Sequence, residues 1–367
     1  MILINFKKEK GKVGVVILLM ISLLCGLCGC SNQKNVQQTE ISGQNLQEYT
    51  KTDFVMDTVL SETIYGKEDL TDAIKEELST LETEKLSWRV DSSETAQINE
   101  KCNRGESFSM DDSFAGWVKT SLLLARASEG AFDPTIGKLT RLWNIEGENP
   151  TVPAQDEIDA VLKNIGYNNI NIEETTQDIS MADGCTLDLG AVGKGIGCDV
   201  ARDFLETRAD VDGAVISIGG SILVYGNKSS GEDWSVAIRD PEDSLDSYMG
   251  VVYLSETACI STSGDYEKYF IQDGEKYHHI LDPSTGYPAK SDLTSVTVVS
   301  DRGEENDGLL SDGLSTACFV LGREKATELL EAYGAEGIFI DKENQVYVTD
   351  GLKDKFEIIN DVYQLMN

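Results

Sequence analysis

The sequence predicts an α+β protein in which a single domain combines a largely antiparallel sheet with flanking helices and an early helical lobe. Between Leu70 and Ile165, apolar residues recur at the three- and four-residue spacing of amphipathic helices. From Gly184 onward, short β-rich runs alternate with helical stretches and are separated by tight turns. Strands joined by tight turns pair antiparallel, which favours α+β over a parallel α/β sheet.

The folded domain is expected over residues 49–367, without an internal linker. It opens with a strand from Phe54 to Tyr65. The next segment contains four leucine or isoleucine residues at helical spacing, from Leu70 to Leu81. The early helices are expected at Leu70–Leu86, Asp112–Ser128, Thr135–Trp143 and Gln155–Ile165, and the last of them stops at Gly166.

The second half of the domain predicts the sheet and its covering helices. Strands are expected at Ala214–Ile218, Ile222–Tyr225, Trp234–Ile238, Val251–Leu254, Tyr269–Gln272, Lys276–Ile280 and Ser295–Ser300. Helices are expected at Val192–Thr207, Leu310–Val320 and Arg323–Tyr333. A closing hairpin pairs Gly337–Ile340 with Gln345–Val348 around a turn at residues 341–344.

The composition is that of a folded protein with a large excess of acidic residues. Of 367 residues, 40% are apolar and 26% are charged, which excludes a disordered chain. The 64 Asp and Glu outnumber the 31 Lys and Arg, and the formal net charge is −33. This charge excludes a basic nucleic-acid binder.

The N-terminus predicts a bacterial lipoprotein leader. Four lysines between positions 7 and 12 precede an apolar run from Val13 to Leu27, which is shorter than the roughly 20 residues of a resident transmembrane helix. The run ends in Leu27-Cys28-Gly29-Cys30, which resembles the lipoprotein cleavage box. Residues 1–29 are therefore the expected signal peptide, and Cys30 the lipidated first residue. An ordinary secretion signal rich in cysteine is the alternative.

A lipid anchor would hold the mature protein at the extracytoplasmic face of the cell membrane. Residues 1–29 contain four Lys and one Glu, so their removal changes the net charge from −33 to −36. An anionic bilayer repels such a chain, and the acyl groups would supply the attachment. Residues 30–48, rich in Gln, Asn, Ser and Thr, are the expected flexible tether.

The cysteines predict neither a disulfide framework nor a zinc site. Three of the eight lie in the leader, and the other five are odd in number, widely spaced and without a Cys-x-x-Cys pair. These five are expected to be small buried hydrophobic residues, and one disulfide among them stays open. They are Cys102, Cys185, Cys198, Cys259 and Cys318.

Two segments combine an acidic residue with small residues near a helix start. In Gly130 to Thr135, Asp133 precedes a proline at the first position of the third expected helix, and taken alone this is a good helix start. In Leu187 to Gly195, an expected strand delivers Asp188, glycines permit close approach of a ligand to the backbone, and Lys194 lies in the first helical turn. This segment lacks the end of a Walker loop, and a glycine-rich turn without a ligand is the alternative.

Two further segments bring an imidazole and oxygen ligands. The only two histidines of the chain are His278 and His279, and strand alternation places one of them on the inner face; a structural histidine is the alternative. Asp312 and Thr316 are four residues apart on one helical face, where they could offer oxygens to Mg²⁺; an Asp cap is the alternative. A hydroxyl-rich turn at 261–266 and the glycine pair at 219–220 accompany them.

In this order and spacing, these segments resemble the ApbE family, the FAD:protein FMN transferases. The resemblance covers essentially the whole mature domain, and the leader fits the family because many members act outside the cytoplasmic membrane. The segments that carry it are Phe54 to Thr58, Ser93 to Asn99, Gly130 to Leu139, Leu187 to Asp199, Gly219-Gly220, Thr262 to Tyr266, His279 to Pro288 and Asp312 to Thr316.

The resemblance implies a role for each matching residue. The flavin site would use Met56 near the isoalloxazine, with Arg89 in the early flavin-contacting turn, and His279 matches the family's catalytic histidine. Mg²⁺ would be held by the Ala191 carbonyl, Asp312 and Thr316. The remaining FAD-contacting residues would be Ala131, Phe132, Asp133, Asp188, Lys194 and the backbone near Leu281.

Three positions depart from the family pattern. Asp57 stands where the family usually has Gly, and Arg89 where many members have Tyr. Ser315 stands where some members have a second acidic metal ligand. These departures bear on ring stacking and metal affinity and leave the reaction class unchanged.

The implied reaction is Mg²⁺-dependent transfer of FMN from FAD to a Thr or Ser hydroxyl of another protein, with release of AMP. His279 or a nearby carboxylate would take the hydroxyl proton. The alternatives are an FAD pyrophosphatase, in which water replaces the protein hydroxyl, and a membrane-tethered flavin-binding lipoprotein without turnover.

Overall fold

The computed structural model describes residues 6–9, 12–15, 46–228, 230–242 and 247–366. Within these ranges, no helix is both long and apolar enough to cross a membrane. In the expected leader, β1 (Phe6–Glu9) pairs antiparallel with β2 (Lys12–Val15). The cleavage box, Cys30 and most of the tether lie outside the described residues, so lipidation stays a prediction.

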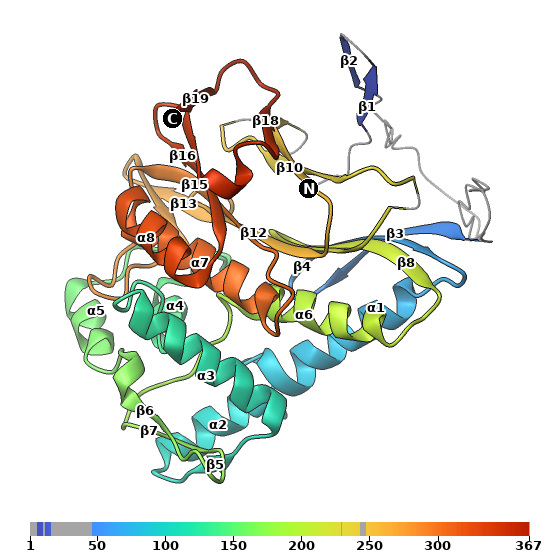
Figure 1. Cartoon of the computed structure of the whole chain (residues 1–367). Coiled ribbons are helices and arrows are strands. Elements are labelled where there is room, and N and C mark those ends of the chain that lie inside the picture. Colours follow the sequence, from blue (N-terminus) through green and yellow to red (C-terminus); the bar gives the residue numbers. More distant parts are fainter. Residues whose placement is uncertain (1–5, 10–11, 16–45, 229, 243–246, 367) are drawn as a thin grey trace, which may run out of the picture.

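A nine-stranded sheet forms the centre of the domain (Figure 1). Its order is β19-β17-β16-β15-β12-β9-β8-β4-β3, and every neighbouring pair is antiparallel except β17 with β19. The predicted α+β fold with a largely antiparallel sheet is confirmed. The strands are β3 Gln47–Val55, β4 Thr58–Gly66, β8 Val211–Ile218, β9 Ser221–Gly226, β12 Ala258–Gly264, β15 Leu293–Ser300, β16 Glu336–Asp341, β17 Gln345–Val348 and β19 Gln364–Met366.

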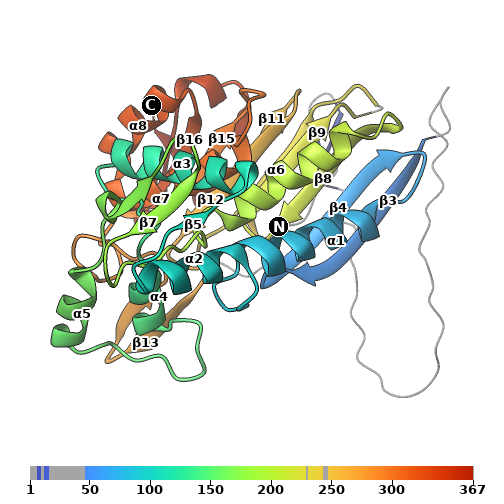
Figure 2. The same ribbon diagram turned by 90° about the horizontal axis from the view of Figure 1, so that it is seen from below.

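Helices cover one face of this sheet, and a small sheet covers the other (Figures 1 and 2). The small sheet places Trp234 and Val252 against Ile260 and Ile338 of the large one. Because both faces are covered, β15 is buried along its whole length instead of alternating. The covering helices are α1 (Thr71–Thr80), α6 (Gly193–Glu206), α7 (Asp307–Leu321) and α8 (Arg323–Tyr333), and the small sheet comprises β10 (Trp234–Arg239), β11 (Tyr248–Leu254) and β18 (Phe356–Ile358).

The early helical lobe packs against α7 and against the β13–β14 hairpin (Figure 2). Trp143 and Ile158 pack on that hairpin, and the Trp143 Nε1 donates a hydrogen bond of 2.7 Å to the Gly286 carbonyl. The lobe therefore supports the segment that carries both histidines. Its elements are a π-helix (Leu81–Leu86), α2 (Glu94–Asn103), α3 (Asp112–Ala127), α4 (Gly137–Trp143), α5 (Gln155–Leu162), a 3-10 turn (Tyr167–Asn169), β5 (Phe108–Ser109), β6 (Ile170–Ile172) and β7 (Asp178–Met181); β13 is Tyr269–Gln272, β14 is Glu275–His278, and a second 3-10 turn spans Asp350–Leu352.

The first predicted strand, Phe54 to Tyr65, is wrong as a single strand. The chain turns back at Met56 and Asp57, both with positive φ, 54° and 53°. A two-residue turn of this kind usually contains Gly or Asn, and neither is present, so the sequence carries no hairpin signal. The partner strand β3 begins at Gln47, two residues before the expected start of the domain.

Three smaller expectations near the candidate motifs are also corrected. Residues 261–264 lie in β12, between β9 and β15, so the expected hydroxyl-rich turn begins only at Asp265. Asp188 follows an extended segment outside any strand, held by a bond from its N–H to the Pro134 carbonyl. Pro134 precedes α4, which begins at Gly137. Helix α2, capped by the Ser93 hydroxyl, has no counterpart among the expected elements.

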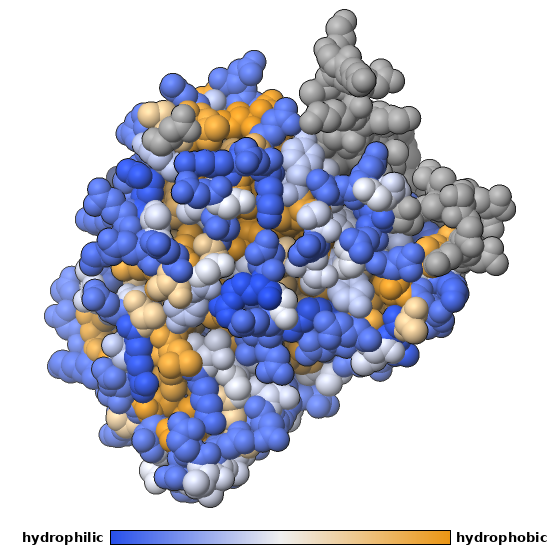
Figure 3. All heavy atoms as spheres, viewed as in Figure 1, coloured by the Kyte–Doolittle hydropathy of each residue, from blue (hydrophilic) through white to orange (hydrophobic). Residues whose placement is uncertain are grey.

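The five cysteines of the domain are buried and free, as expected for small hydrophobic residues. Figure 3 shows that this face of the protein is dominated by hydrophilic residues, with hydrophobic ones exposed in separate patches.

Candidate active site

All twelve site residues predicted within the domain line one cleft of about 540 Å³. They come from the β3–β4 turn, the early lobe, the segment leading into α6, the end of β14, and α7. The residues are Met56, Arg89, Ala131, Phe132, Asp133, Asp188, Ala191, Lys194, His279, Leu281, Asp312 and Thr316. The motifs therefore converge in space.

The β3–β4 turn places two non-glycine residues in left-handed conformations at the cleft. The Met56 N–H donates a 2.9 Å hydrogen bond to the Glu82 carboxylate. The Asp57 carboxylate lies 3.7 Å from the Arg89 guanidinium. Such conformations are costly outside glycine and tend to occur at functional sites. Asp57 and Arg89, two departures from the family pattern, thus form one ion pair at the entrance.

Trp88 also lines the cleft and was not predicted. The guanidinium groups of Arg89 and Arg141 lie over its ring, 4.4 and 4.2 Å from the ring centroid. The aromatic surface at this turn thus comes from the residue before Arg89. Its adjacency to Arg89 was the available signal, but the sequence does not show which of two neighbouring side chains points inward.

The two acids of the early motifs hold the backbone of the cleft wall. The buried Asp133 carboxylate accepts bonds from the Thr135 N–H and hydroxyl and from the Tyr167 N–H, at 2.8, 2.6 and 2.9 Å. Asp188 uses Oδ1 to accept the Gly190 N–H at 2.9 Å. Burial raises the pKa of both carboxyls. Asp133 therefore orders the loop that presents Ala131 and Phe132, and Asp188 keeps one oxygen for a ligand.

The ends of α6 and α7 bring Lys194 and Asp312 together. The Lys194 ammonium lies 3.5 Å from Asp312 Oδ1, and the Gly195 N–H donates to Asp312 Oδ2 at 3.0 Å. The Asp312 carboxylate raises the pKa of Lys194. Asp312 lies in the second turn of α7, so the alternative of an N-cap is wrong.

Thr316 faces the cleft one turn beyond Asp312, with its hydroxyl 3.4 Å from that of Ser263. Ser315 is buried behind it and bonds to the Ser263 hydroxyl at 2.7 Å and to the Asp312 carbonyl. Ser315 is thus absent from the cleft wall. The hydroxyl of Ser315 fills a position between α7 and β12.

The two histidines line different cavities. The expected strand Lys276–Ile280 ends at His278, so His279 lies just beyond β14 and is not placed by strand alternation. His279 lines the cleft, whereas the buried His278 lines a second cavity of about 420 Å³ and bonds through Nε2 to the Ala289 carbonyl. Burial, with Lys194 and Lys268 nearby, lowers the pKa of His279 to about 3. His279 is therefore neutral at physiological pH, and its Nδ1 is buried without a hydrogen-bond partner.

Several charged residues of the cleft lie outside the sequence motifs, among them Arg239 and Glu267. The Arg239 guanidinium lies 5.4 Å from the Tyr266 ring centroid, and its Nε is buried without a hydrogen-bond partner. Glu267 lines the same wall. Arg239 ends a strand of the small sheet, and nothing in the surrounding sequence indicates that this sheet reaches the cleft.

The donors at Asp312 suit a hard cation that is shared with a substrate. In the described part of the chain, no three His, Cys, Asp or Glu side chains gather as a metal cage. A carboxylate, a hydroxyl and a backbone carbonyl at Asp312, Thr316 and Ala191 are oxygen donors, and Mg²⁺ commonly completes such a shell with water and phosphate. The residues present therefore fit Mg²⁺ and do not fit a preformed calcium or zinc site.

Comparison with known proteins agrees with this geometry. The sequence model of the ApbE family matches residues 56–339. The chain belongs to the ApbE family. The matched span contains all twelve of the predicted site residues that line the cleft.

Some relatives in this family align with more than nine tenths of the chain. The FAD:protein FMN transferase of Treponema pallidum is 30% identical, with 93% of this chain and 95% of the relative aligned. The crystal structure of the ApbE protein from Thermotoga maritima has a TM-score of 0.76 and 31% identity, and the match covers 84% of this chain and 99% of that one. The flavin transferase ApbE from Vibrio cholerae has a TM-score of 0.71 at 27% identity, over 84% and 99% of the two chains. The single-domain ApbE fold of this chain is therefore established.

Proposed function

We propose that this chain transfers the FMN moiety of FAD to a Thr or Ser hydroxyl of an acceptor protein and releases AMP. The observation that carries the proposal is the shared cleft, in which cations, oxygen donors and a neutral imidazole surround one space. The names of its relatives, FAD:protein FMN transferases, point to the same reaction.

In the proposed reaction the acceptor oxygen forms a bond to the FMN-side phosphorus. The bond from that phosphorus to the bridging oxygen breaks, and AMP leaves with this oxygen. The hydroxyl proton passes to the neutral ring of His279 or to the Glu267 carboxylate on the same wall. Positioning and electrostatics carry such phosphoryl chemistry, so the enzyme needs no nucleophile of its own.

The cations of the cleft would offset the electrostatic repulsion between an anionic substrate and this very acidic protein. Lys194 would contact the diphosphate and Arg89 would border the flavin, while Asp188 offers its free oxygen to a hydroxyl of the nucleotide. Mg²⁺, held by Asp312, Thr316 and the Ala191 carbonyl, would neutralise diphosphate charge. Met56, Ala131, Phe132 and the backbone near Leu281 would enclose the flavin and nucleotide rings.

Two assays separate this proposal from its rivals. The full chain is incubated with FAD and Mg²⁺, with and without an extracytoplasmic acceptor protein, and both AMP and protein-bound flavin are measured. Flavin on the acceptor in amounts equal to AMP supports the transferase. AMP without flavin transfer would identify a pyrophosphatase, and retained FAD that yields no AMP would identify a flavin-binding protein without turnover.

We also propose that the protein is lipid-anchored through Cys30. The basic start, apolar run and Cys-Gly-Cys end of the leader support this, together with the repulsion expected between an anionic bilayer and a −36 chain. Expression of Cys30→Ser in a bacterial host tests it. Loss of the protein from the membrane fraction is expected, and an unchanged fraction would exclude the anchor.

A further inference from the structure

Helices α6 and α7 cross with their backbones in direct contact. A Cβ atom placed on Gly195 would lie 2.0 Å from the Gly308 carbonyl oxygen, and one placed on Gly308 would lie 2.2 Å from the Gly195 carbonyl oxygen. Real Cβ contacts do not approach this closely. Glycine is therefore required on both helices, and the crossing leaves little freedom for either to slide.

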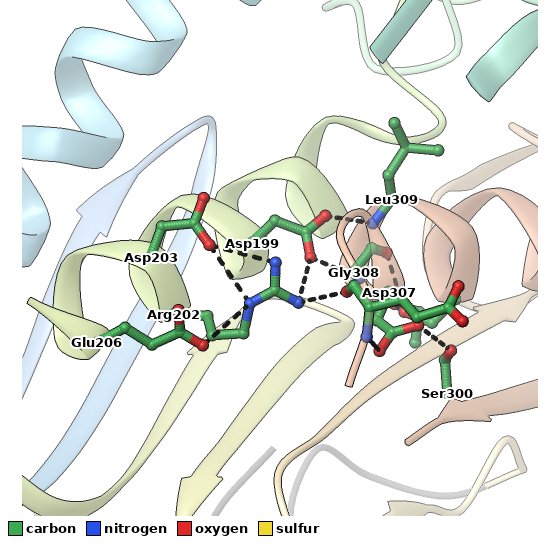
Figure 4. Close-up of polar contacts among 11 residues, drawn as sticks. Asp199, Arg202, Asp203, Glu206, Ser300, Asp307, Gly308 and Leu309 are labelled. Carbon is green, nitrogen blue, oxygen red and sulfur yellow. Dashed lines mark hydrogen bonds and ion pairs between the residues drawn. The ribbon is translucent and has the colours of Figure 1, made fainter. Parts of the chain in front are cut away.

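At this crossing each helix receives a carboxylate from the other. Asp199 of α6 accepts the N–H groups of Gly308 and Leu309 at 2.8 and 2.9 Å (Figure 4). Asp312 of α7 accepts the Gly195 N–H at 3.0 Å. The same spacing, a glycine followed four residues later by an aspartate, occurs on both helices, at Gly195–Asp199 and at Gly308–Asp312.

These exchanged bonds replace ordinary helix capping. The residues that precede the two helices, Val192 and Asn306, make no side-chain cap. The first amides of a helix need an acceptor, and a carboxylate also interacts favourably with the positive end of the helix dipole. Each helix therefore depends on the other's aspartate for its N-terminal hydrogen bonds.

The two aspartates differ in what their remaining surfaces meet. Asp199 is 3% exposed and lies 3.4 Å from the Arg202 guanidinium, which also donates to the Glu304 carbonyl at 3.0 Å (Figure 4). Asp312 lies at the cleft beside Lys194. The hydrogen bonds of Asp199 are thus buried inside the protein, whereas the hydrogen bond of Asp312 lies at the cleft.

We infer that Asp199 is a positioning residue for the metal: by binding the first amides of α7 it holds Asp312 and Thr316 in register with the Ala191 carbonyl ahead of α6. Gly308, Asp312 and Thr316 follow one another at four-residue intervals, so they share one helical face. A slip of α7 at Gly308 would move both metal-ligating side chains together. This inference rests on the proposed magnesium site.

The test compares Asp199→Asn with Asp203→Asn in the full chain. Asp203 lies on the same helix and also contacts Arg202, but its side chain is 67% exposed. With saturating FAD, the Mg²⁺ concentration for half-maximal rate is measured, and Mn²⁺ binding is followed by electron paramagnetic resonance. Asp199→Asn is expected to weaken both by about tenfold or more, the usual effect of losing a residue that orients a metal ligand. Asp203→Asn is expected to change neither.

A second variant and a second site keep the outcomes distinct. Asp199→Ala removes both acceptor oxygens, whereas Asp199→Asn keeps one, so Asp199→Ala is expected to weaken metal binding further than Asp199→Asn. Asp199 variants that melt at lower temperature but keep the wild-type metal constants would show that Asp199 only stabilises the fold, and the inference would be wrong. Unchanged metal binding in Asp312→Asn would instead remove the magnesium site itself, and this inference with it.

Discussion

Gly195→Ala is the substitution whose consequences the structure determines most closely. The new methyl group would meet the Gly308 carbonyl oxygen at 2.0 Å and the Asp312 Cβ at 2.8 Å. Neither atom belongs to the end of a flexible side chain, so α6 and α7 must separate. Overpacking of this kind costs about 1–3 kcal/mol, and weakening the bond from the Gly195 N–H to Asp312 costs about 1.5–3 kcal/mol more.

The helix propensity of alanine offsets part of this loss. Alanine is about 1 kcal/mol better than glycine inside a helix, so the expected net destabilisation is on the order of 2–5 kcal/mol. That is smaller than the total stability of most domains, roughly 5–15 kcal/mol. The variant is therefore expected to fold, with a weakened Asp312 site.

Gly116→Ala is the matched control, because Gly116 lies inside α3 and a Cβ there meets no atom within 4 Å. It is expected to stabilise the protein by up to about 1 kcal/mol. Urea unfolding gives both changes from the midpoints at equal slope, and Mg²⁺ titration of the flavin transfer rate follows the site. If Gly195→Ala were as stable as Gly116→Ala, or bound Mg²⁺ as tightly as wild type, the close-contact reasoning would be refuted.

Three further predictions concern buried groups. Glu62 is fully buried with both carboxyl oxygens unpartnered, and burial raises its pKa from 4.5 to about 8. The folded state keeps a proton that the unfolded state releases above pH 4.5, so the free energy of unfolding falls between pH 4.5 and pH 8. Glu62→Gln should therefore raise the free energy of unfolding at pH 7 by on the order of 3 kcal/mol, measured by calorimetry. The pKa of His279 is lowered from 6.5 to about 3, so its effect on stability has the opposite pH dependence: the unfolded state binds a proton below pH 6.5, and stability is lost as the pH falls. His279→Gln should remove on the order of 2 kcal/mol of that loss at pH 5 and should lower the rate of flavin transfer. An unchanged dependence of stability on pH would contradict the buried neutral imidazole. Trp143→Phe deletes the hydrogen bond to the Gly286 carbonyl and should lower the free energy of unfolding by about 1–3 kcal/mol. Because Leu281 lies in the same loop as Gly286, the KM for FAD should also rise. A wild-type KM would show that the early lobe does not support the cleft.

Local patterns in the sequence predicted most of the helices, though not α2, and the segments that line the cleft. Apolar spacing placed α3 and α8 because one face of each helix is buried, and the periodicity records that burial. The sequence also predicted that only one of the two histidines would face the site, although His279 lies just beyond the end of β14. The twelve predicted site residues from Met56 to Thr316 line one cleft, and each was found because it lies in a short segment whose acids, glycines and turns stand out locally.

Partners that are distant in the sequence were decided only by the tertiary structure. The turn at Met56 and Asp57 contains neither Gly nor Asn, and Glu82, 26 residues after Met56, accepts the Met56 N–H. Arg239 reaches the cleft because the small sheet packs over the large one. The exchange of Asp199 and Asp312 between two helix ends exists only once α6 and α7 cross. Such hydrogen bonds and close helix crossings join residues that are far apart in the sequence, so local composition and periodicity carry no signal for them.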